Sequence, residues 1–206
     1  MLATLTHGQR GTPFIYQGEE IGMTDPEYTS IDDYVDVEAH NAYHSLLDAG
    51  LAPAEAFDIV HARARDNGRT PVQWDDSPTA GFTTGVPWLA PTNQDRINVA
   101  DELATGRIFR HYQGLIALRR AHPAIAEGTY EAWEREHPAV HAFLRTHDDE
   151  ELLVVCNLTA NPQEIPLPEG VADGTILSDN YPGTSLTPDL PLQPYQALVI
   201  AKGAQS

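Results

Sequence analysis

The chain has 206 residues and carries 30 acidic against 12 basic side chains, a formal net charge of −18. Nucleic acids and anionic membranes bind clusters of Lys and Arg, so this charge argues against both as partners and leaves a neutral ligand such as a sugar compatible. No run approaches the roughly 20 apolar residues that span a bilayer. Cys156 is the only cysteine, and its apolar surroundings predict an inert core thiol in a reducing compartment. We expect a soluble, cytoplasmic protein.

The first segment, residues 1–9, has leucines at helical spacing and predicts the last turns of a helix. The β-branched and aromatic run Thr12–Tyr16 then predicts a strand that ends at two adjacent carboxylates, Glu19 and Glu20. Parallel barrels keep their chemistry at such carboxyl ends of strands. Because no helix N-cap precedes the first segment, we expect the natural domain to extend upstream.

Two helical patterns, Ile31–Leu47 and Pro53–Ala64, predict a helical hairpin whose first helix has an acidic start that favours the helix dipole. Residues 65–98 are irregular and rich in Gly, Pro, Asp and Thr, with Trp74 and Trp88 among them. Long loops of this kind are functional or disordered. The sequence leaves two roles open for each indole, which either stacks on a sugar ring or anchors the loop to the core.

An amphipathic helix is predicted over Thr105–His122, with Arg119 and Arg120 on its solvated face. After Pro123 the apolar period changes to two, which predicts a small antiparallel sandwich. The predicted strands are Gly128–Trp133, Ala139–His147, Glu151–Leu158, Thr175–Leu177 and Tyr195–Ala201.

Two local motifs suggest chemistry that we do not expect. His40 and His44 have the spacing of a helical zinc pair, but Asn41 stands where a zinc protease needs glutamate, and no third ligand is near. Asn157 begins a glycosylation sequon at the end of an apolar strand, where we interpret it as incidental.

The acidic and polar clusters are better candidates for a sugar site. Glycoside hydrolysis uses two carboxyl groups, but the adjacent side chains of Glu19 and Glu20 point apart, so a structural role, hydrogen-bonded to backbone amides, is favoured for them. Glu38 is consistent with a surface acid at a helix start. In the cluster Arg65–Arg69 a guanidinium next to a carboxylate could hold a sugar hydroxyl; from chemistry alone a loop salt bridge is the favoured interpretation.

Five stretches of the chain, in order and with family-like spacing, carry a resemblance that covers nearly its whole length. They are GTPFIYQGEEIGM, IDDYVDVE, ARDNGRTPVQWDD, AGFTTGVPW and IFRHYQGLIALRRAHPAI. The chain resembles glycoside hydrolase family 13, the α-amylase family. More narrowly, it is similar to the oligo-1,6-glucosidase and α-glucosidase subgroup, which also contains sucrose isomerases and trehalose-6-phosphate hydrolases.

The resemblance implies an α/β plus all-β fold. Residues 1–123 would be the end of a TIM (β/α)8 barrel, with Thr12–Tyr16 as strand eight, a helical insertion, and Arg107–His122 as helix eight. Residues 124–206 would be the C-terminal antiparallel β-sandwich domain.

The resemblance also implies a retaining glycosidase whose catalytic carboxylates follow earlier barrel strands, so that no catalytic residue matches in this chain and the chain alone would be inactive. Arg65 matches an arginine that holds the nonreducing-end glucose, and Glu38 matches an acid near the adjoining sugar site. Glu19 and Glu20 match a structural signature. No cofactor or metal ligand is implied here, because the family's calcium ligands also lie upstream.

The implied partners are small-molecule α-glucosides, with no nucleic acid and no membrane. Because a lone barrel strand leaves both edges unpaired, we also expect contact with the missing N-terminal barrel portion or self-association. Alternatives are a noncatalytic glucan-binding module, for which the sandwich offers few aromatic residues, or a noncatalytic partner subunit. The sandwich aromatics considered are Tyr130, Trp133, Tyr181 and Tyr195.

Overall fold

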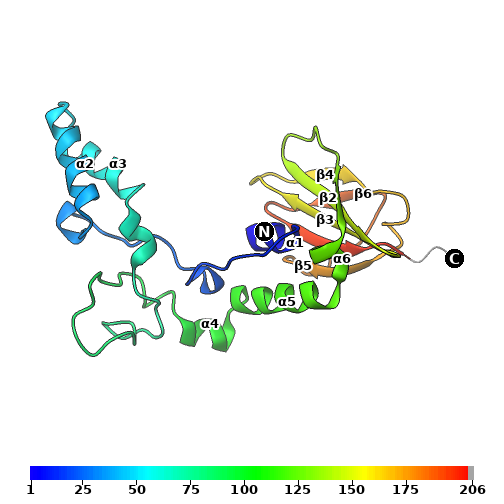
Figure 1. The fold of residues 1–206 in the computed structure, drawn as a ribbon, viewed down its shortest axis with the longest axis horizontal. Helices are drawn as coiled ribbons and strands as arrows, with labels where there is room; N and C mark the ends of the chain where they lie inside the picture. The colour runs from blue at the N-terminus through cyan, green and yellow to red at the C-terminus, as the bar shows by residue number, and fades with distance from the viewer. Residues whose placement is uncertain (204–206) are drawn as a thin grey trace. The chain divides into compact units, whose positions relative to one another are not determined.

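The structure is a computed structural model that describes residues 1–203 (Figure 1). The chain forms two compact units, one made of Met1–Phe14 and the chain from Arg110 onward, the other of Ile15–Phe109. We call them the sheet unit and the loop unit. Among the helices that the structure describes, none is long and apolar enough to cross a lipid bilayer.

The sheet unit contains two antiparallel sheets. The five-stranded sheet has the order β1-β2-β3-β7-β5, and β4 pairs with β6 in a two-stranded sheet. Their bounds are β1 Thr129–Trp133, β2 Val140–His147, β3 Glu150–Asn157, β4 Gln163–Pro166, β5 Thr175–Asp179, β6 Asp189–Leu192 and β7 Ala197–Ala201. The predicted antiparallel sandwich is therefore confirmed.

The five-stranded sheet is buried on both faces, which explains the continuous apolar run in β3. One face packs against the two-stranded sheet through side chains such as Leu153, Leu144 and Ile165. The other face packs against helices through Phe143 and Val154. Those helices are α1 Leu2–Gly8, α5 Ile108–Ala121 and α6 Pro123–Glu127.

Cys156 lies on the helix-covered face and is fully buried. Burial raises the pKa of its thiol to about 12. The prediction of an inert core cysteine is confirmed, because the reactive thiolate is scarcely populated at neutral pH.

The sequence missed β4 and β6. Each strand has four residues and contains a proline, Pro166 or Pro191, which removes a ladder hydrogen bond and weakens the alternating pattern. Their inward residues Ile165, Leu190 and Leu192 are nevertheless almost fully buried.

Arg119 corrects the prediction of a solvated arginine pair on α5. Its Nη1 donates to the carbonyl oxygens of His7 and Gln9 at 2.9 and 2.8 Å, and its Nη2 donates to that of Gly11. The guanidinium satisfies carbonyls where α1 ends, so this arginine joins α5 to the segment after α1. Arg120 is exposed, as predicted.

The loop unit consists of short helices joined by irregular segments. In Figure 1, α2 and α3 lie side by side, as the predicted hairpin requires. Its helices are η1 Glu19–Ile21, η2 Ile31–Asp33, α2 Val37–Asp48, α3 Pro53–His61, η3 Arg65–Arg69 and α4 Val99–Thr105. The sequence did not predict α4, which Asn98 caps by accepting from the backbone nitrogen of Asp101.

The first helix of the hairpin begins at Val37 and not at Ile31 as predicted. Residues 31–33 form a separate 3-10 turn, closed by a capping box between Ser30 and Asp33. The acidic residues of this stretch therefore serve two successive helix starts. The second helix ends at His61, three residues before its predicted end.

Residues 12–16 are not a strand in the structure, contrary to prediction. A strand requires a hydrogen-bonded neighbour, and within the described residues no segment pairs with this one. Phe14 is 86% exposed, so the apolar side chains expected to fill a barrel lie uncovered here.

The stretch predicted to be irregular, residues 65–98, begins with the 3-10 helix η3, and residues 70–98 contain no described helix or strand. Buried Gln73 joins the two ends of this loop. Its side-chain Nε2 donates to the backbone carbonyl of Ile97 at 2.6 Å, and its backbone carbonyl accepts the backbone N–H of Val99 at 2.8 Å. Trp74 and Trp88 are each more than half exposed. Neither indole is buried in the core of this unit, and a sugar-stacking role for them stays a prediction.

Candidate functional site

The loop unit brings together two residues that lie 27 positions apart in the sequence, Glu38 and Arg65. Glu38 lies in the first turn of α2, and Arg65 begins η3. Their Oε2 and Nη2 atoms are 2.8 Å apart, and both side chains are more than half exposed. The two residues expected to touch sugar therefore form one ion pair at the surface of this unit.

Asp36, the N-cap residue of α2, is the main partner of Arg65. Nε of Arg65 donates to Oδ2 of Asp36 at 2.9 Å, and Nη2 donates to Oδ1 at 3.0 Å. This is the bidentate arrangement in which a planar guanidinium matches a carboxylate. The favoured loop salt bridge was expected within the cluster Arg65–Arg69, whereas the main partner of Arg65 lies outside it, at a distant helix start.

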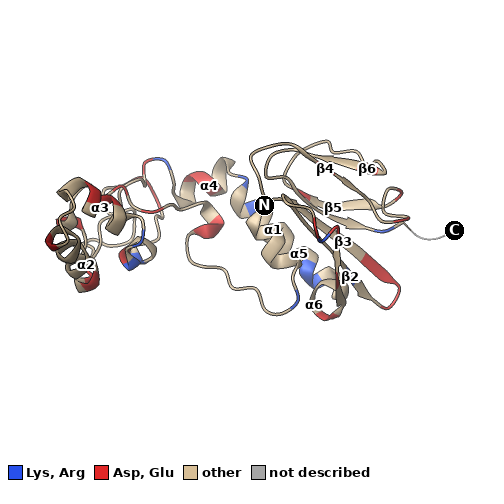
Figure 2. Cartoon of the chain, turned by 90° about the horizontal axis from the view of Figure 1, so that it is seen from above, with Lys and Arg blue, Asp and Glu red and all other residues tan. Residues whose placement is uncertain are grey.

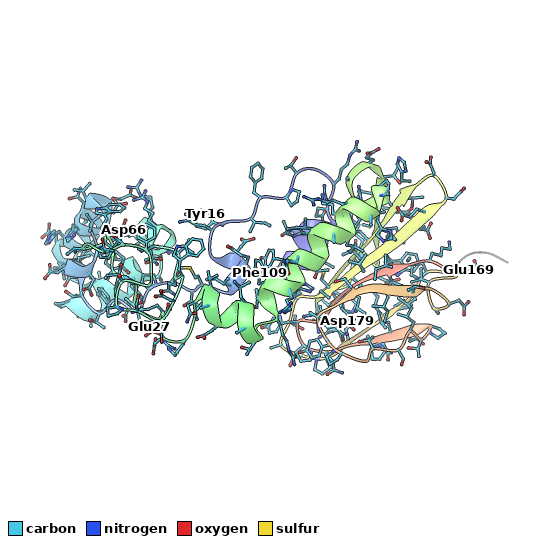
Figure 3. The ribbon with its side chains drawn as sticks, turned by 90° about the horizontal axis from the view of Figure 1, so that it is seen from below. Tyr16, Glu27, Asp66, Phe109, Glu169 and Asp179 are labelled. Carbon is cyan, nitrogen blue, oxygen red and sulfur yellow. The ribbon has the colours of Figure 1, made fainter. Side chains whose placement is uncertain are left out.

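Asp66 holds the backbone beside the ion pair of Asp36 and Arg65. It is fully buried, and its Oδ2 accepts the backbone nitrogens of Val35 and Asp36 at 2.9 and 2.8 Å. Arg69 bridges the two aspartates, because its Nη1 lies 3.0 Å from Asp36 and 3.3 Å from Asp66. Figure 3 labels Asp66 in the helical part of this unit, where many side chains crowd together.

A second set of hydrogen bonds holds η3 against the helical hairpin. The hydroxyl of Tyr34 lies 2.6 Å from Nδ1 of His61 and 3.2 Å from Oδ1 of Asn67, and Nδ2 of Asn67 donates to the carbonyl of His61 at 2.7 Å. Burial and neighbouring carboxylates raise the pKa of Tyr34 to about 12. The phenol therefore stays neutral and available as a hydrogen-bond donor.

The charges at this site fit binding better than acid catalysis. The hydrogen bond from Arg65 and that from the backbone of Glu38 hold the pKa of Asp36 below its usual range. A glycosidase acid needs the opposite shift, so that it is still protonated at neutral pH. Asp36 is thus a fixed anion that holds guanidinium groups.

Beside the ion pair is a hollow of about 150 Å³. Its wall combines the charged groups of Asp36, Glu38 and Arg65 with apolar side chains of α2 and α3, such as Leu46 and Ile59. Figure 2 shows acidic residues along α2, α3 and α4 of this unit. Charged groups next to an apolar surface suit a ligand that has both hydroxyls and a carbon face.

Glu19 and Glu20 lie apart from this ion pair, in the 3-10 turn η1. Gly18 and Gly22 bracket the turn with φ of 92° and 74°, and a Cβ at Gly18 would lie 2.5 Å from the sulfur of Met23. Oε2 of Glu20 accepts the backbone nitrogen of Gly18 at 2.8 Å, which is the kind of contact predicted for a structural carboxylate.

Glu19 lines a second hollow of about 360 Å³ in this unit. The hollow lies between the turn and η3, whose Gly68 carbonyl accepts the hydroxyl of Tyr16 at 2.5 Å. This hydrogen bond joins the stretch of Glu19 and Glu20 to the segment that begins at Arg65.

The other motifs have structural uses. Nε2 of His40 hydrogen-bonds to the carbonyl of Tyr34 at 2.8 Å, and within the described residues no group of three or more His, Cys, Asp or Glu could hold a metal ion. Asn157 is buried, and its Nδ2 donates to the carbonyls of Asn161 and Gln193. The buried amide supports the interpretation of its sequon as incidental.

The aromatic residues of the sheet unit are engaged in packing and backbone contacts. Tyr130 stacks on Phe143 with ring centroids 5.1 Å apart. Nε1 of Trp133 donates to the carbonyl of Pro166, and the hydroxyl of Tyr181 donates to that of Pro194, each at 2.8 Å. Only the stack of Tyr130 covers an aromatic face, and Tyr195 is about half exposed.

Sequence reasoning missed Asp36 as a site residue. It was assigned only to the acidic start of a helix, and it lies 29 positions before Arg65. The available signal was an aspartate at an N-cap followed by another acid two positions later. That pattern predicts a helix start but does not identify a distant guanidinium as its partner.

Comparison with known proteins identifies the family. The family model described as the alpha amylase catalytic domain matches residues 1–128, and that of the alpha-amylase SusG C-terminal domain matches residues 140–199. The chain belongs to the alpha-amylase family. The resemblance seen in the sequence is therefore confirmed, as is the fold class of a barrel portion followed by a β domain.

Three similar proteins show the range of relatives within this family. An oligo-1,6-glucosidase of Halalkalibacterium halodurans is 42% identical over 206 residues. The crystal structure of Bacillus licheniformis trehalose-6-phosphate hydrolase matches with a TM-score of 0.92 at 38% identity. That of the trehalulose synthase MutB from Pseudomonas mesoacidophila matches with a TM-score of 0.88 at 37% identity.

The chain spans little more than a third of these family members. The three matches cover 97%, 98% and 98% of this chain, but only 36%, 38% and 37% of the respective relatives. The domain boundary at residue 123 and the sugar-binding roles of Arg65 and Glu38 remain predictions.

Proposed function

We propose that this chain is the C-terminal part of a retaining α-glucosidase that hydrolyses short α-linked gluco-oligosaccharides. In this proposal the chain supplies part of the substrate pocket, while the nucleophile and the acid/base belong to barrel strands upstream. The chain alone is then inactive, because hydrolysis with retention needs both carboxyl groups.

The observation that carries the proposal is the state of Arg65. Asp36 and Glu38 occupy Nε and Nη2, and within the described residues Nη1 has no hydrogen-bond partner. The side chain is 54% exposed. The two N–H groups of Nη1 can donate to the hydroxyls of a sugar, and Glu38 can accept a hydroxyl from the same ligand.

The substrate class follows from the relatives named above. An oligo-1,6-glucosidase and a trehalose-6-phosphate hydrolase are both among them, and both names denote enzymes that act on glucosides. A trehalose-6-phosphate hydrolase or a sucrose isomerase is therefore the alternative identity of the whole protein. A noncatalytic glucan-binding or partner module is the alternative of a different class.

The test uses a hybrid enzyme in which this chain replaces the aligned part of the Halalkalibacterium halodurans oligo-1,6-glucosidase. We expect the hybrid to release nitrophenol from p-nitrophenyl α-glucoside and to cleave isomaltose with retention of configuration. Faster cleavage of trehalose 6-phosphate would favour that alternative, and trehalulose formation from sucrose would favour the isomerase. A correctly folded hybrid that cleaves none of these substrates would overturn the proposal.

The binding alternative is tested on the chain itself. Titration with maltotriose, followed by tryptophan fluorescence and by calorimetry, would show saturable binding if the chain is a glucan-binding module, since Trp74 and Trp88 are exposed. The proposal predicts no saturable signal from the chain alone in either measurement.

A further inference from the structure

The guanidinium of Arg65 is held along one edge only. Nε and Nη2 both donate to Asp36, at 2.9 and 3.0 Å, which fixes the plane of the group as well as its position. Nη1 lies at the other end of the guanidinium. The direction in which its N–H groups point is therefore set by the carboxylate of Asp36.

Asp36 is itself fixed from several sides. Its Oδ1 accepts the backbone nitrogen of Glu38 at 3.0 Å, Arg69 donates to its Oδ2 at 3.0 Å, and its backbone nitrogen donates to buried Asp66 at 2.8 Å. Its side chain is only 6% exposed. A carboxylate with these contacts cannot follow a moving arginine, so the arginine must adopt the orientation that the carboxylate dictates.

Glu38 is a weaker constraint on Arg65. A single contact at 2.8 Å joins them, and the Glu38 side chain is 70% exposed. Exposed ion pairs of this kind contribute little, because water screens them and both side chains lose rotamer freedom. Of the two acids that contact Arg65, Asp36 determines its orientation.

We propose that Asp36 is a positioning residue that presents Nη1 of Arg65 to a hydroxyl of the bound glucoside. This inference rests on the proposed function, in which Arg65 touches the substrate. Asp36 acts through Arg65 and does not touch the sugar. Its benefit is preorganisation: the arginine is ordered before the ligand arrives, so that binding does not have to restrict it.

The variant Asp36→Asn separates positioning from helix capping. Asparagine caps helices as well as aspartate does, so α2 keeps its start. The amide has one acceptor oxygen and no charge, so it cannot offer a separate oxygen to each of the two donors of Arg65. Glu27→Gln is the matched control, because it removes one negative charge from the same unit and thereby breaks the ion pair between Glu27 and Arg96.

The first experiment measures the reactivity of Arg65 in the 206-residue chain. Phenylglyoxal modifies accessible guanidinium groups, and mass spectrometry of the peptides reports the rate for each arginine. We expect Asp36→Asn to increase the rate at Arg65 about fivefold, since a bidentate carboxylate no longer covers Nε and Nη2. Glu27→Gln should affect Arg96 and leave Arg65 unchanged. An unchanged rate at Arg65 in Asp36→Asn would overturn the inference.

The second experiment compares the kinetics of the hybrid enzyme. We expect Arg65→Ala to raise the KM for isomaltose about tenfold, because one charged hydrogen bond to the substrate is lost. Asp36→Asn should raise this KM about fivefold and leave kcat nearly constant. The double variant should be no worse than Arg65→Ala alone. Millimolar guanidinium should lower the KM of Arg65→Ala, but not that of the double variant, because Asp36 holds the added ion.

The outcomes distinguish this inference from the proposed function. If Arg65→Ala leaves KM unchanged, Arg65 does not touch the sugar, and its assigned role in the proposed function fails. If Arg65→Ala raises KM while Asp36→Asn does not, the positioning role alone fails. If the hybrid is inactive, the proposed function fails, and the phenylglyoxal rates still decide whether Asp36 holds Arg65.

Discussion

The two units of this chain are stabilised in different ways. In the sheet unit, a five-stranded sheet is covered on both faces by apolar side chains from a second sheet and from helices. In the loop unit, one small apolar cluster around Tyr34 and Val60 is accompanied by buried polar groups. Those buried polar residues are Asp36, Asp66, Asn67, Thr70, Gln73, Asn93 and Asn98. The sheet unit also buries polar residues beside its larger apolar core, namely Thr4, His7, Arg145, Asn157 and Gln196.

The difference shows where specificity for a ligand can arise. Apolar packing is non-directional and depends mainly on area and volume, so the core of the sheet unit stabilises the fold without orienting polar groups. Charged hydrogen bonds are directional, and they orient each donor in the loop unit. The residues proposed to touch sugar therefore lie in the unit that has the smaller apolar core.

The largest expected effect is the loss of a core side chain from the sheet unit. Leu153 is fully buried between the two sheets, and Leu153→Ala should lower the free energy of unfolding by about 3 kcal/mol, because burial is lost and a cavity remains. Leu158→Ala is the control on the same unit, since Leu158 is exposed, and it should change stability by less than about 0.5 kcal/mol. Equal effects in urea unfolding would contradict the assignment of the core.

The next effect concerns the arginine that the sequence placed in solvent. Arg119→Met should lower the free energy of unfolding by about 2 kcal/mol, because three carbonyls lose a charged donor. Arg120→Met should have almost no effect, since Arg120 is exposed. Thermal unfolding of the two variants side by side checks this, and a loss of stability in Arg120→Met alone would refute it.

The smallest of the three effects, compared at pH 10, is a pH dependence that distinguishes the units. Cys156 titrates near 9 when unfolded and at about 12 when folded. Above pH 9 the unfolded state loses this proton first, so the free energy of unfolding should fall, by about 1.4 kcal/mol at pH 10. In the loop unit the raised pKa of Tyr28 and that of Tyr34, each about 12, should add a loss only above pH 10.

Urea unfolding between pH 8 and 11 measures both contributions. Cys156→Ala should remove the loss between pH 9 and 10, because the thiol is then absent, and leave above pH 10 only the part of the loss that comes from Tyr28 and Tyr34. If the free energy of unfolding falls with pH equally steeply in Cys156→Ala and in the unchanged chain, the thiol is not buried.

The sequence predicted the sheet unit well because its longer strands have continuous or alternating apolar runs. It missed β4 and β6, which are four-residue strands with prolines. In the loop unit it predicted the hairpin, the irregular loop and the polar cluster that begins at Arg65. It could not pair Arg65 with Asp36 or Arg119 with Gly11, because such contacts depend on the tertiary fold and leave no periodic pattern.

Residues 12–16 show the same dependence on tertiary contacts, here in a segment that was predicted to be a strand and is not one. Its composition favours a strand, yet a strand forms only with a hydrogen-bonding neighbour, and none pairs with it within the described residues. Propensity indicated the state that this segment could adopt. The state that it has depends on what lies beside it.

The most direct test of the account is the release of nitrophenol from p-nitrophenyl α-glucoside by the purified 206-residue chain. The matched control is the same chain with Glu38→Ala and Arg65→Ala together, which removes the proposed sugar contacts. We expect no release above this control, because the chain supplies sugar contacts and no catalytic pair. Release that clearly exceeds the control would contradict it, since the chain would then contain its own catalytic carboxylates.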